Sequence, residues 1–411
     1  MVAYAATDIS VASIMLKSRP QPRASLHVIF VASRFRDGGV EQRINRLAAG
    51  MLQHGVRCTF LLGETGEGAA GEAVPDGVNV EVHGRLERGL HGRLRSLTPT
   101  EDGPAIAVIA FRATDYSFVV ATVRRQGNHR IGAFLITGAH ISERLQGTGL
   151  SRIRAAKLRY RMRRQWSRAD GVLAISPDIA DDWRDTGIFP PNSIHAVHPP
   201  VVGEDVTRLA AAKPEHAWAS DDGPPIIVGV GRLHPVKRFN VLLDAFHRVR
   251  AKRELRLVIL GRGPEERALR QQAQALGIAE HVAFPGFTTN PYAWMRRARL
   301  LVLPSLHEPF GLVLIESLFT GTPFIALEAA KGPASIKSAT GMGRLAPGAD
   351  DRTLAATIED ELAQSPCRER LHQSARPYDT INSATEHLAI VSGWLGVPRP
   401  QPLPASGGAE G

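Results

Sequence analysis

Short apolar runs alternate with longer stretches of helical periodicity along most of the chain. Five runs in the first half have the length and composition of strands: 27–32, 56–62, 105–111, 131–137 and 171–175. After the first run, apolar residues recur at the spacing of one buried helix face, namely Val40, Ile44, Leu47, Ala48 and Met51. Strands that alternate with helices in this way predict an α/β fold, with parallel sheets and helices on both faces.

Two proline pairs interrupt this pattern near the middle of the chain. After 190–191 and 199–200 the alternation starts again and predicts a second sheet. Its expected strands are 225–230, 255–260, 282–284, 300–303 and 323–327. Its expected helices are 240–250, 265–276, 293–297 and 310–320. We therefore predict two α/β domains with a boundary near residue 202, the first over 26–202 and the second over 203–382.

The two ends of the chain do not share this pattern. Residues 1–25 are expected to form a flexible leader, because Asp8 interrupts their apolar part and the basic residues follow it, unlike a signal peptide. The Pro/Gly-rich residues 398–411 are expected to form a flexible tail. No run approaches the roughly 18 apolar residues of a spanning helix. Cys58 and Cys367 are the only cysteines, so we expect a reducing, cytoplasmic compartment.

The net charge of +10 is concentrated in one segment. Residues 151–168 hold seven Arg, one Lys and no acidic residue. As a helix, this segment would place Ala155, Leu158, Met162 and Trp166 in a narrow apolar stripe flanked by arginines. Two interpretations remain open: a helix packed on the first sheet with a solvated basic face, and a helix whose basic face also contacts anionic lipid. Nucleic acid is disfavoured, because no recognition module accompanies the charge.

The strongest chemical signal is a pair of carboxylates in EPFGLVLIE, residues 308–316. Glu308 would lie in the loop after strand 300–303, at the edge where open α/β sheets bind ligands. Phe310, Gly311 and Leu312 would present backbone N–H groups at a helix start, which suits a phosphate. Glu316 could accept hydrogen bonds from vicinal hydroxyls. An exposed loop acid and an ordinary helix acid would give the same spacing.

Basic and glycine residues follow the first strand of each predicted sheet. In GRLHPVKRF, residues 231–239, Arg232 and Lys237 flank a strand-to-helix turn. Two such cations could hold a diphosphate and stabilise it as a leaving group without a metal ion; a solvated basic loop is the alternative. Gly38 and Gly39 would let a helix start approach a phosphate closely, since glycine lacks a Cβ atom, although any tight strand–helix turn uses glycine as well.

Several motifs together resemble those of the family-4 glycosyltransferases. GRLHPVKRFNVLLDAF, ILGRGPE, VAFPGF and LPSLHEPFGLVLIESLFTGTPFIA occur in the order and spacing of that family. The likeness covers 226–345 well and extends more weakly to the first half, through GGVEQRINRLAAGMLQHG and ADGVLAISPDIADDW. It implies the GT-B fold: two Rossmann-like domains facing a central cleft, and a C-terminal helix, 383–397, that crosses back to the N-terminal domain.

The resemblance also implies roles for individual positions. Those matching Arg232 and Lys237 hold the donor diphosphate, and the glycine turn matching Gly38 and Gly39 lets the N-terminal helix approach the donor phosphate. The position matching Glu308 faces the donor sugar, and the position matching Glu316 binds the ribose. His140, after strand 131–137, only loosely matches the family's active-site histidine. It could donate to a sugar hydroxyl, although a lone histidine is often structural.

Three features of the sequence limit what can be expected of the donor, the cofactor and the metal ion. Ser335 stands where the family has an acid, so the donor sugar and the choice between UDP and GDP are not predicted. Glu266 replaces the third glycine of a dinucleotide fingerprint that begins GRG at 261–263, so a nicotinamide cofactor is not expected. No cluster of metal ligands is evident, and we expect the two cations to make a metal ion unnecessary.

We therefore predict a retaining glycosyltransferase that moves a sugar from a nucleoside diphosphate donor to an acceptor hydroxyl. The acceptor is expected to be a glycan or a lipid-linked saccharide in cell-surface polysaccharide or glycolipid synthesis. No cofactor is expected beyond this co-substrate. The expected location is the cytoplasm; the lipid-contact interpretation of 151–168 would add peripheral attachment to the inner face of the cell membrane. Two alternatives remain: another GT-B enzyme, such as an epimerase or a phosphorylase, and a partner subunit without turnover.

Overall fold

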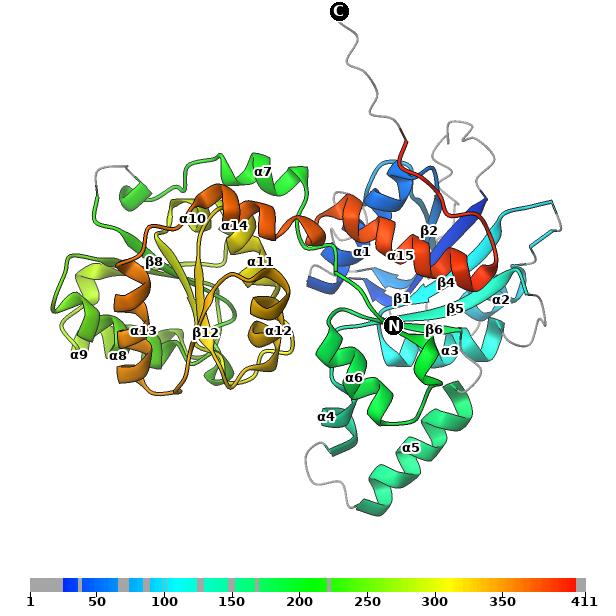
Figure 1. The fold of residues 1–411 in the computed structure, drawn as a ribbon, viewed down its shortest axis with the longest axis horizontal. Coiled ribbons are helices and arrows are strands. Elements are labelled where there is room, and N and C mark those ends of the chain that lie inside the picture. The colour runs from blue at the N-terminus through cyan, green and yellow to red at the C-terminus, as the bar shows by residue number, and fades with distance from the viewer. Residues whose placement is uncertain are drawn as a thin grey trace, which may run out of the picture.

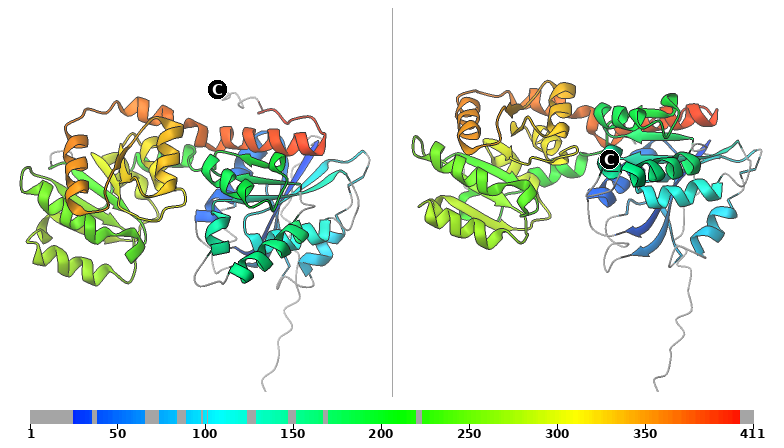
Figure 2. Two further views of the ribbon diagram at one scale, coloured as in Figure 1. Left: turned by 60° about the horizontal axis from the view of Figure 1, so that its bottom comes forward. Right: turned by 90° about the horizontal axis from the view of Figure 1, so that it is seen from below.

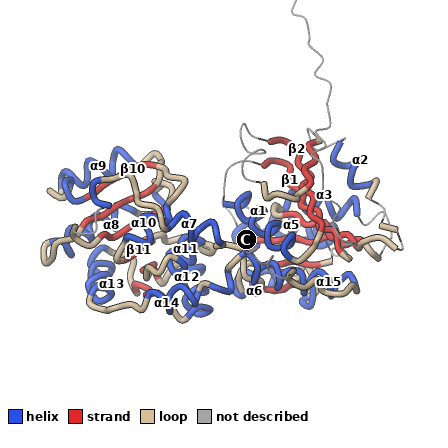
Figure 3. Tube along the Cα trace, turned by 90° about the horizontal axis from the view of Figure 1, so that it is seen from above, coloured by secondary structure: helices blue, strands red, loops and turns tan. Residues whose placement is uncertain are grey.

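The computed structural model describes residues 25–35, 39–65, 74–83, 89–97, 99–100, 102–123, 129–146, 152–166, 170–219 and 223–403. These residues form two domains that lie side by side, each with one parallel sheet (Figure 1). Seen from above, helices lie on both sides of the strands in each domain (Figure 3). The predicted α/β fold with two Rossmann-like domains is therefore confirmed.

The N-terminal domain holds a seven-stranded sheet in the order β3-β2-β1-β4-β5-β6-β7. Its strands are β1 (Leu26–Phe35), β2 (Arg57–Thr65), β3 (Asn79–Val82), β4 (Ala105–Ala110), β5 (Ile131–Thr137), β6 (Gly171–Ala174) and β7 (Ile194–Ala196). Its helices are α1 (Gly39–Gln53), α2 (Gly89–Arg95), α3 (Ala113–Val123), α4 (Ile141–Gln146), α5 (Arg152–Trp166) and α6 (Pro177–Asp185). All strand pairs are parallel, so the carboxyl ends of the strands share one edge.

The central strands are apolar along their whole length because helices cover both faces of the sheet. Every residue of β4 and β5 is buried, as is typical of parallel strands. Helix α1 buries Ile44, Leu47, Ala48 and Met51, while Val40 is only partly buried. The helical periodicity of this segment therefore predicted its packed face, because apolar residues three and four positions apart share one side of a helix.

The C-terminal domain holds a six-stranded parallel sheet in the order β10-β9-β8-β11-β12-β13. Its strands are β8 (Ile226–Val230), β9 (Arg256–Leu260), β10 (Val282–Gly286), β11 (Leu300–Leu303), β12 (Phe324–Leu327) and β13 (Arg344–Ala346). Its helices are α7 (Glu204–Ala210), α8 (Phe239–Arg250), α9 (Glu266–Ala275), α10 (Pro291–Arg297), α11 (Leu312–Phe319), α12 (Lys331–Thr340), α13 (Asp351–Leu362) and α14 (Arg368–Ser374). The strand order reverses between β8 and β11, which gives the doubly wound topology.

Some boundaries differ from those that the sequence predicted. The helix expected at 310–320 begins only at Leu312, because Gly311 closes the preceding loop with a φ of 94°. The last helix, α15 (Thr380–Leu395), begins three residues before the expected start, where Asp379 caps it by accepting the N–H of Asn382 at 2.7 Å. Strands β3, β7 and β13 were not predicted; each has only three or four residues.

The chain passes between the domains twice, and the two passes pair with each other. The N–H of Val201 donates to the carbonyl oxygen of Tyr378 at 2.9 Å, and that of Thr380 donates to Val202 at 2.9 Å. Helix α15 then lies along the N-terminal domain (Figures 1 and 2). It approaches α1 so closely that a Cβ atom on Gly50 would stand 2.3 Å from the Thr380 oxygen. The predicted boundary near residue 202 falls at this crossing, and the domain limits stay a prediction.

The chain beyond α15 returns along the N-terminal domain. The N–H of Leu403 donates to the carbonyl oxygen of Gln53, at the end of α1, at 2.7 Å. Leu403 thus contacts the domain, and the flexibility expected for 398–411 stays a prediction. The remainder of that tail, 404–411, and residues 1–24 of the predicted leader lie outside the described residues.

Candidate active site

Two of the sequence motifs follow neighbouring strands of the C-terminal sheet. The GRLHPVKRF motif begins directly after β8, and the loop that carries Glu308 follows β11. These strands pair in parallel at the point where the strand order reverses. Both loops therefore leave the same edge of the sheet, at the crevice where doubly wound sheets bind ligands.

Lys237 and Glu308 meet at this edge of the sheet. Nζ of Lys237 lies 2.5 Å from Oε2 of Glu308, and the two side chains are only 23% and 13% exposed. Such a charge-assisted contact fixes both groups in place, because each is largely removed from water. Arg232 is exposed and forms no ion pair with any residue that the structure describes. Of the two cations predicted to hold the diphosphate, Lys237 is thus paired with a carboxylate, while Arg232 faces solvent.

The turn that carries Lys237 ends in an uncommon backbone conformation. A 3-10 turn spans Pro235–Lys237, and Arg238 then adopts a left-handed conformation with φ 53° and ψ 39° before α8 begins. Among the described residues, Arg238 alone combines a side chain with a positive φ. This conformation costs a residue with a Cβ atom about 1–2 kcal/mol. It marks the turn as a place where the chain accepts strain to hold a set shape.

Glycines let two loops of this crevice pack backbone against backbone. A Cβ atom on Gly261 would stand 1.9 Å from the oxygen of Gly231, and one on Gly263 would stand 2.1 Å from that of Leu233. The N–H of Leu233 donates to the carbonyl oxygen of Arg262 at 2.9 Å, which joins the loops. The glycines of the GRG segment therefore support the Arg232–Lys237 loop, a role that accounts for them without any bound dinucleotide.

The loop between β11 and α11 has a similar support. The N–H of Gly332, in α12, donates to the carbonyl oxygen of Glu308 at 3.1 Å. A Cβ atom on Gly332 would stand 2.4 Å from the Cα of Phe310, so only glycine fits there. The ring of Phe310 is buried, so this residue can offer a ligand only its backbone. Gly311 turns the chain into α11, and Leu312 is the first residue of that helix.

The N-terminus of α1 meets the N-terminus of α11 across the two domains. A Cβ atom on Gly39 would stand 3.8 Å from Cδ1 of Leu312. Each helix start carries a partial positive charge and unpaired N–H groups, so the two together favour an anion between them. The predicted diphosphate residues Gly39 and Leu312 are thereby brought together. Gly38 lies outside the described residues.

Glu316 lies one turn into α11 and belongs to a contact between the domains. Its Oε1 accepts the hydroxyl of Tyr292, the second residue of α10, at 3.4 Å. The Tyr292 oxygen in turn accepts Nη2 of Arg46, from α1, at 3.1 Å. Burial raises the pKa of Glu316, while the positive charge of Arg46 opposes this rise. The predicted ribose carboxylate is therefore held by residues that no sequence motif indicated.

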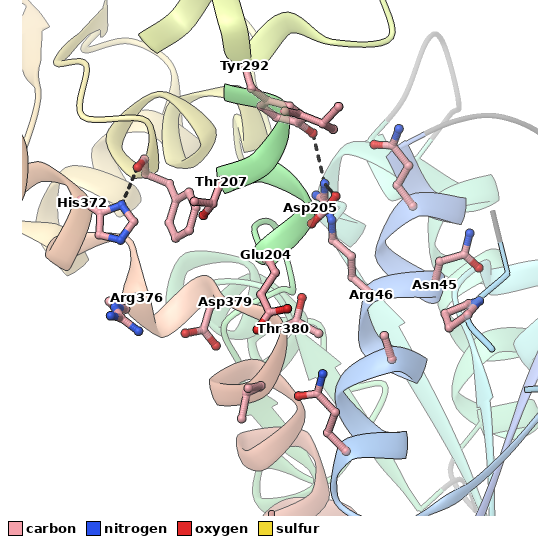
Figure 4. A pocket seen from close by; sticks show the side chains of 18 of the residues that line it. Asn45, Arg46, Glu204, Asp205, Thr207, Tyr292, His372, Arg376, Asp379 and Thr380 are labelled. Atoms are coloured by element: carbon pink, nitrogen blue, oxygen red, sulfur yellow. Dashed lines mark hydrogen bonds and ion pairs between the residues drawn. The ribbon is translucent and has the colours of Figure 1, made fainter. Parts of the chain in front are cut away.

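Arg46 and Tyr292, but neither Glu316 nor the Lys237–Glu308 pair, line a cavity of about 620 Å³ between the domains. Arg46, Asp205 and Tyr292 converge on it from α1, α7 and α10 (Figure 4). Arg46 and Tyr292 are 246 residues apart in the chain. In the sequence, Arg46 is only a polar position on an amphipathic helix, and Tyr292 only an aromatic residue near a helix start, so neither gave a signal.

His140 lies apart from these groups in the contacts that the structure records. It precedes α4, is only 3% exposed, and its Nε2 lies 3.0 Å from Oδ2 of Asp178 in the first turn of α6. This pair links the residue before α4 to α6 at the carboxyl edge of the N-terminal sheet. A role for His140 as a donor to a sugar hydroxyl stays a prediction.

The described residues contain no group of three or more His, Cys, Asp and Glu side chains placed to hold a metal ion. None of the helices in this part of the chain combines the length and the hydropathy needed to span a bilayer.

Comparison with known proteins assigns the two halves of the chain to related families. The model of the family described as Glycosyltransferase Family 4 matches residues 37–204, and that described as Glycosyl transferases group 1 matches residues 213–377. The lipopolysaccharide core biosynthesis glycosyltransferase LpsD of Rhizobium meliloti is 32% identical over 227 residues, which are 54% of this chain and 62% of that protein. The D-inositol 3-phosphate glycosyltransferase of Jonesia denitrificans is 31% identical, over 49% of this chain and 51% of its own.

The fold is shared over a greater length than the sequence. HepE of Anabaena in complex with UDP covers 89% of this chain and 99% of its own, with a TM-score of 0.67 and 16% identity. The WaaB lipopolysaccharide outer core galactosyltransferase gives a TM-score of 0.64 over 90% of this chain. By contrast, the chain spans only about half to three-fifths of the length of the curated relatives that it matches. Two adjoining family models and a shared two-domain architecture lead to one assignment: this chain belongs to the family-4 glycosyltransferases and has the GT-B fold.

Proposed function

We propose that the protein is a retaining glycosyltransferase that moves a sugar from a nucleoside diphosphate donor to an acceptor hydroxyl. The observation that carries this proposal is the Lys237–Glu308 ion pair, which lies at the edge of the C-terminal sheet where the strand order reverses. The converging starts of α1 and α11 add a second feature that favours an anion. The names of the relatives agree with such an activity.

Each group has a definite task in this reaction. The bond between the anomeric carbon and the diphosphate oxygen breaks, and the diphosphate leaves with the bonding electrons. Arg232, Lys237 and the helix starts stabilise the charge that develops on it. The acceptor oxygen attacks from the same face, so the configuration is retained, and its proton passes to the departing diphosphate. Glu308 orients the donor sugar, and Glu316 accepts hydrogen bonds from the ribose. No metal ion takes part in this scheme.

We propose a glycan or a lipid-linked saccharide as the acceptor, in cell-surface polysaccharide or glycolipid synthesis. Support comes from the relatives, since LpsD carries the name of a lipopolysaccharide core enzyme and another relative that of a transferase acting on a diphospho-undecaprenol saccharide. Both names describe a saccharide assembled on a lipid.

A panel of UDP and GDP sugars tests the proposed donor class. A donor present at 100 times its dissociation constant should raise the free energy of unfolding by about 2.7 kcal/mol, because it binds only the folded protein. The midpoint of thermal unfolding reports this change. The stabilising donor should also release free nucleoside diphosphate slowly in water. Stabilisation without any such release, even with candidate acceptors, would indicate a binding subunit and contradict the proposed enzyme.

Helix α5 supports peripheral attachment to an anionic membrane on the cytoplasmic side. Its predicted apolar stripe faces the domain: Met162 and Trp166 are buried, and Nε1 of Trp166 donates to Oγ of Ser117 at 2.9 Å. The opposite side exposes Ile153 and Tyr160, which are 80% and 65% exposed. Around them lie five exposed cations: Lys157, Arg159, Arg161, Arg163 and Arg164. Figure 1 shows α5 at the outer edge of the N-terminal domain.

This arrangement predicts binding that depends on salt. Each basic residue near an anionic surface contributes about 1 kcal/mol, and the attraction is screened beyond about 8 Å at physiological ionic strength. The protein should therefore co-sediment with vesicles containing anionic lipid at low salt and be released as salt rises. Changing Arg159, Arg161, Arg163 and Arg164 together to Gln should abolish this binding and leave donor hydrolysis intact.

A matched control removes the same charge elsewhere. Arg253, Arg267, Arg352 and Arg370 are exposed in the C-terminal domain, and their change to Gln should leave vesicle binding largely unaltered. Equal loss in the two variants would show that total charge, rather than α5, governs attachment. Equal binding to neutral vesicles would contradict the electrostatic proposal.

A further inference from the structure

A chain of three polar groups connects the N-terminal domain to the predicted ribose carboxylate. Nη2 of Arg46, in α1, donates to the hydroxyl oxygen of Tyr292 at 3.1 Å and to Oδ2 of Asp205 at 3.1 Å. The Tyr292 hydroxyl lies 3.4 Å from Oε1 of Glu316. Figure 4 shows Arg46 and Tyr292 pointing toward each other beside Asp205.

The protons that each side chain can donate fix the direction of the hydrogen bonds among Arg46, Tyr292 and Glu316. A guanidinium has only donors, so the Tyr292 oxygen must accept from Arg46. A phenol has a single proton, which is then left to be donated to Glu316. Burial raises the pKa of Tyr292 to about 12, so this proton is retained at neutral pH. The contact engages one oxygen of Glu316 and leaves the other carboxylate oxygen for a ligand.

Burial holds these hydrogen-bonded side chains in fixed positions. The side chain of Arg46 is only 13% exposed, and its guanidinium also donates to the carbonyl oxygen of Val201 at the domain crossing. Tyr292 is 5% exposed. Because Arg46 has three hydrogen-bond partners, Tyr292, Asp205 and Val201, its side chain has little freedom to turn away from any of them.

We infer that Arg46 is a positioning residue for donor binding: through Tyr292, it holds the Glu316 carboxylate in the orientation that receives the ribose hydroxyls. The inference rests on the proposed function, since that assigns the ribose to Glu316. It extends the donor site to a residue of the N-terminal domain. Ribose recognition then depends on how the two domains are placed, because α1 and α11 belong to different domains.

The inference is tested by removing the Tyr292 hydroxyl from the protein and the two ribose hydroxyls from the nucleotide. The probes are UDP or GDP, whichever binds the unaltered protein, and its 2′,3′-dideoxy form. Loss of the ribose hydroxyls should weaken binding to the unaltered protein about 10- to 100-fold, as expected for hydrogen bonds to a charged group. The ratio of the two dissociation constants, dideoxy nucleotide over ordinary nucleotide, measures this loss. In Tyr292→Phe the ratio should fall to less than about 5-fold, because Glu316 loses its orienting partner. The dissociation constant of the dideoxy nucleotide should change little.

Tyr160→Phe, on the surface of α5, makes the same chemical change away from the donor site and should keep the full ratio. Equal weakening of both nucleotides in Tyr292→Phe, or an unchanged ratio, would overturn the inference while leaving the proposed function in place. If the unaltered protein binds neither UDP nor GDP, the proposed function fails and the inference fails with it.

A pH series on Arg46→Gln gives an independent readout. The groups that face Glu316 are Arg46 from α1, Asp205 from α7 and Tyr292 from α10. Arg46 lowers the pKa of Glu316 against the rise caused by burial, so its removal should let that pKa rise further. Nucleotide binding needs the ionised carboxylate, and the loss of affinity on acidification should therefore begin at a higher pH. A uniform loss at every pH would mean that Arg46 acts only as a structural contact.

Discussion

Replacing Lys237 with alanine is expected to lower the turnover number about 10²–10³-fold, the usual effect of removing one preorganised charge donor. Its ammonium group lies in the crevice after β8, where the leaving diphosphate of the proposed reaction would gain charge. Arg232→Ala should have an effect of the same order, since that residue supplies the second cation of the loop. Steady-state kinetics with the donor found by the nucleotide panel would measure both.

The control for this experiment must separate chemistry from stability. Lys237→Ala leaves the largely buried carboxylate of Glu308 without its cation, which should itself lower the free energy of unfolding. Rates must therefore be compared below the unfolding midpoint of each variant. Lys252→Ala removes a lysine of the same domain that is paired with Glu359 on the surface, and it should retain full activity. Activity that survives the Arg232, Lys237 double change would end the proposed role of these cations.

The two carboxylates are expected to respond differently to the same change. Glu308→Gln should lower turnover by about two orders of magnitude while leaving the affinity for the nucleoside diphosphate nearly unaltered, because Glu308 acts on the reacting sugar. Glu316→Gln should instead weaken that affinity about 10-fold or more, since a charged acceptor of the ribose hydroxyls is lost.

Titration calorimetry with the nucleoside diphosphate, beside steady-state kinetics with the sugar donor, measures both effects. The two variants serve as controls for each other, because each removes one negative charge without changing the size of the side chain. An equal loss of affinity in both would contradict the division of labour between the sugar and the ribose.

The apolar runs predicted the central strands well because these strands are buried on both faces. The segments 131–137 and 300–303 coincide with β5 and β11. The pattern found the edge strand β10 but missed the edge strands β3 and β13: β3 has two exposed and two half-buried residues, and β13 has one buried residue in three. Short, half-exposed strands carry too few apolar residues to stand out from loops.

Sequence motifs predicted which loops leave the same edge of the C-terminal sheet, while the roles of the residues in those loops stay predictions. The strand-to-loop positions of Lys237 and Glu308 indicated one sheet edge, and these side chains are in contact. The Arg46–Tyr292–Glu316 contacts were not predicted, because they depend on how two domains dock rather than on any local pattern. Likewise, the left-handed Arg238 lies where a turn would favour glycine, so no propensity indicated it.

The docking of α15 on α1 sets an order for folding during synthesis. His54 and Thr385, whose side chains lie 2.8 Å apart, are separated by 331 residues. At about 5–20 residues per second, the ribosome needs roughly 15 to 65 s to make the segment between them. Throughout that time the N-terminal domain lacks the helix that later contributes the buried Ala384, Leu388 and Val391. The first domain to be synthesised is therefore the last to be completed, and until then its uncovered apolar surface is available to chaperones.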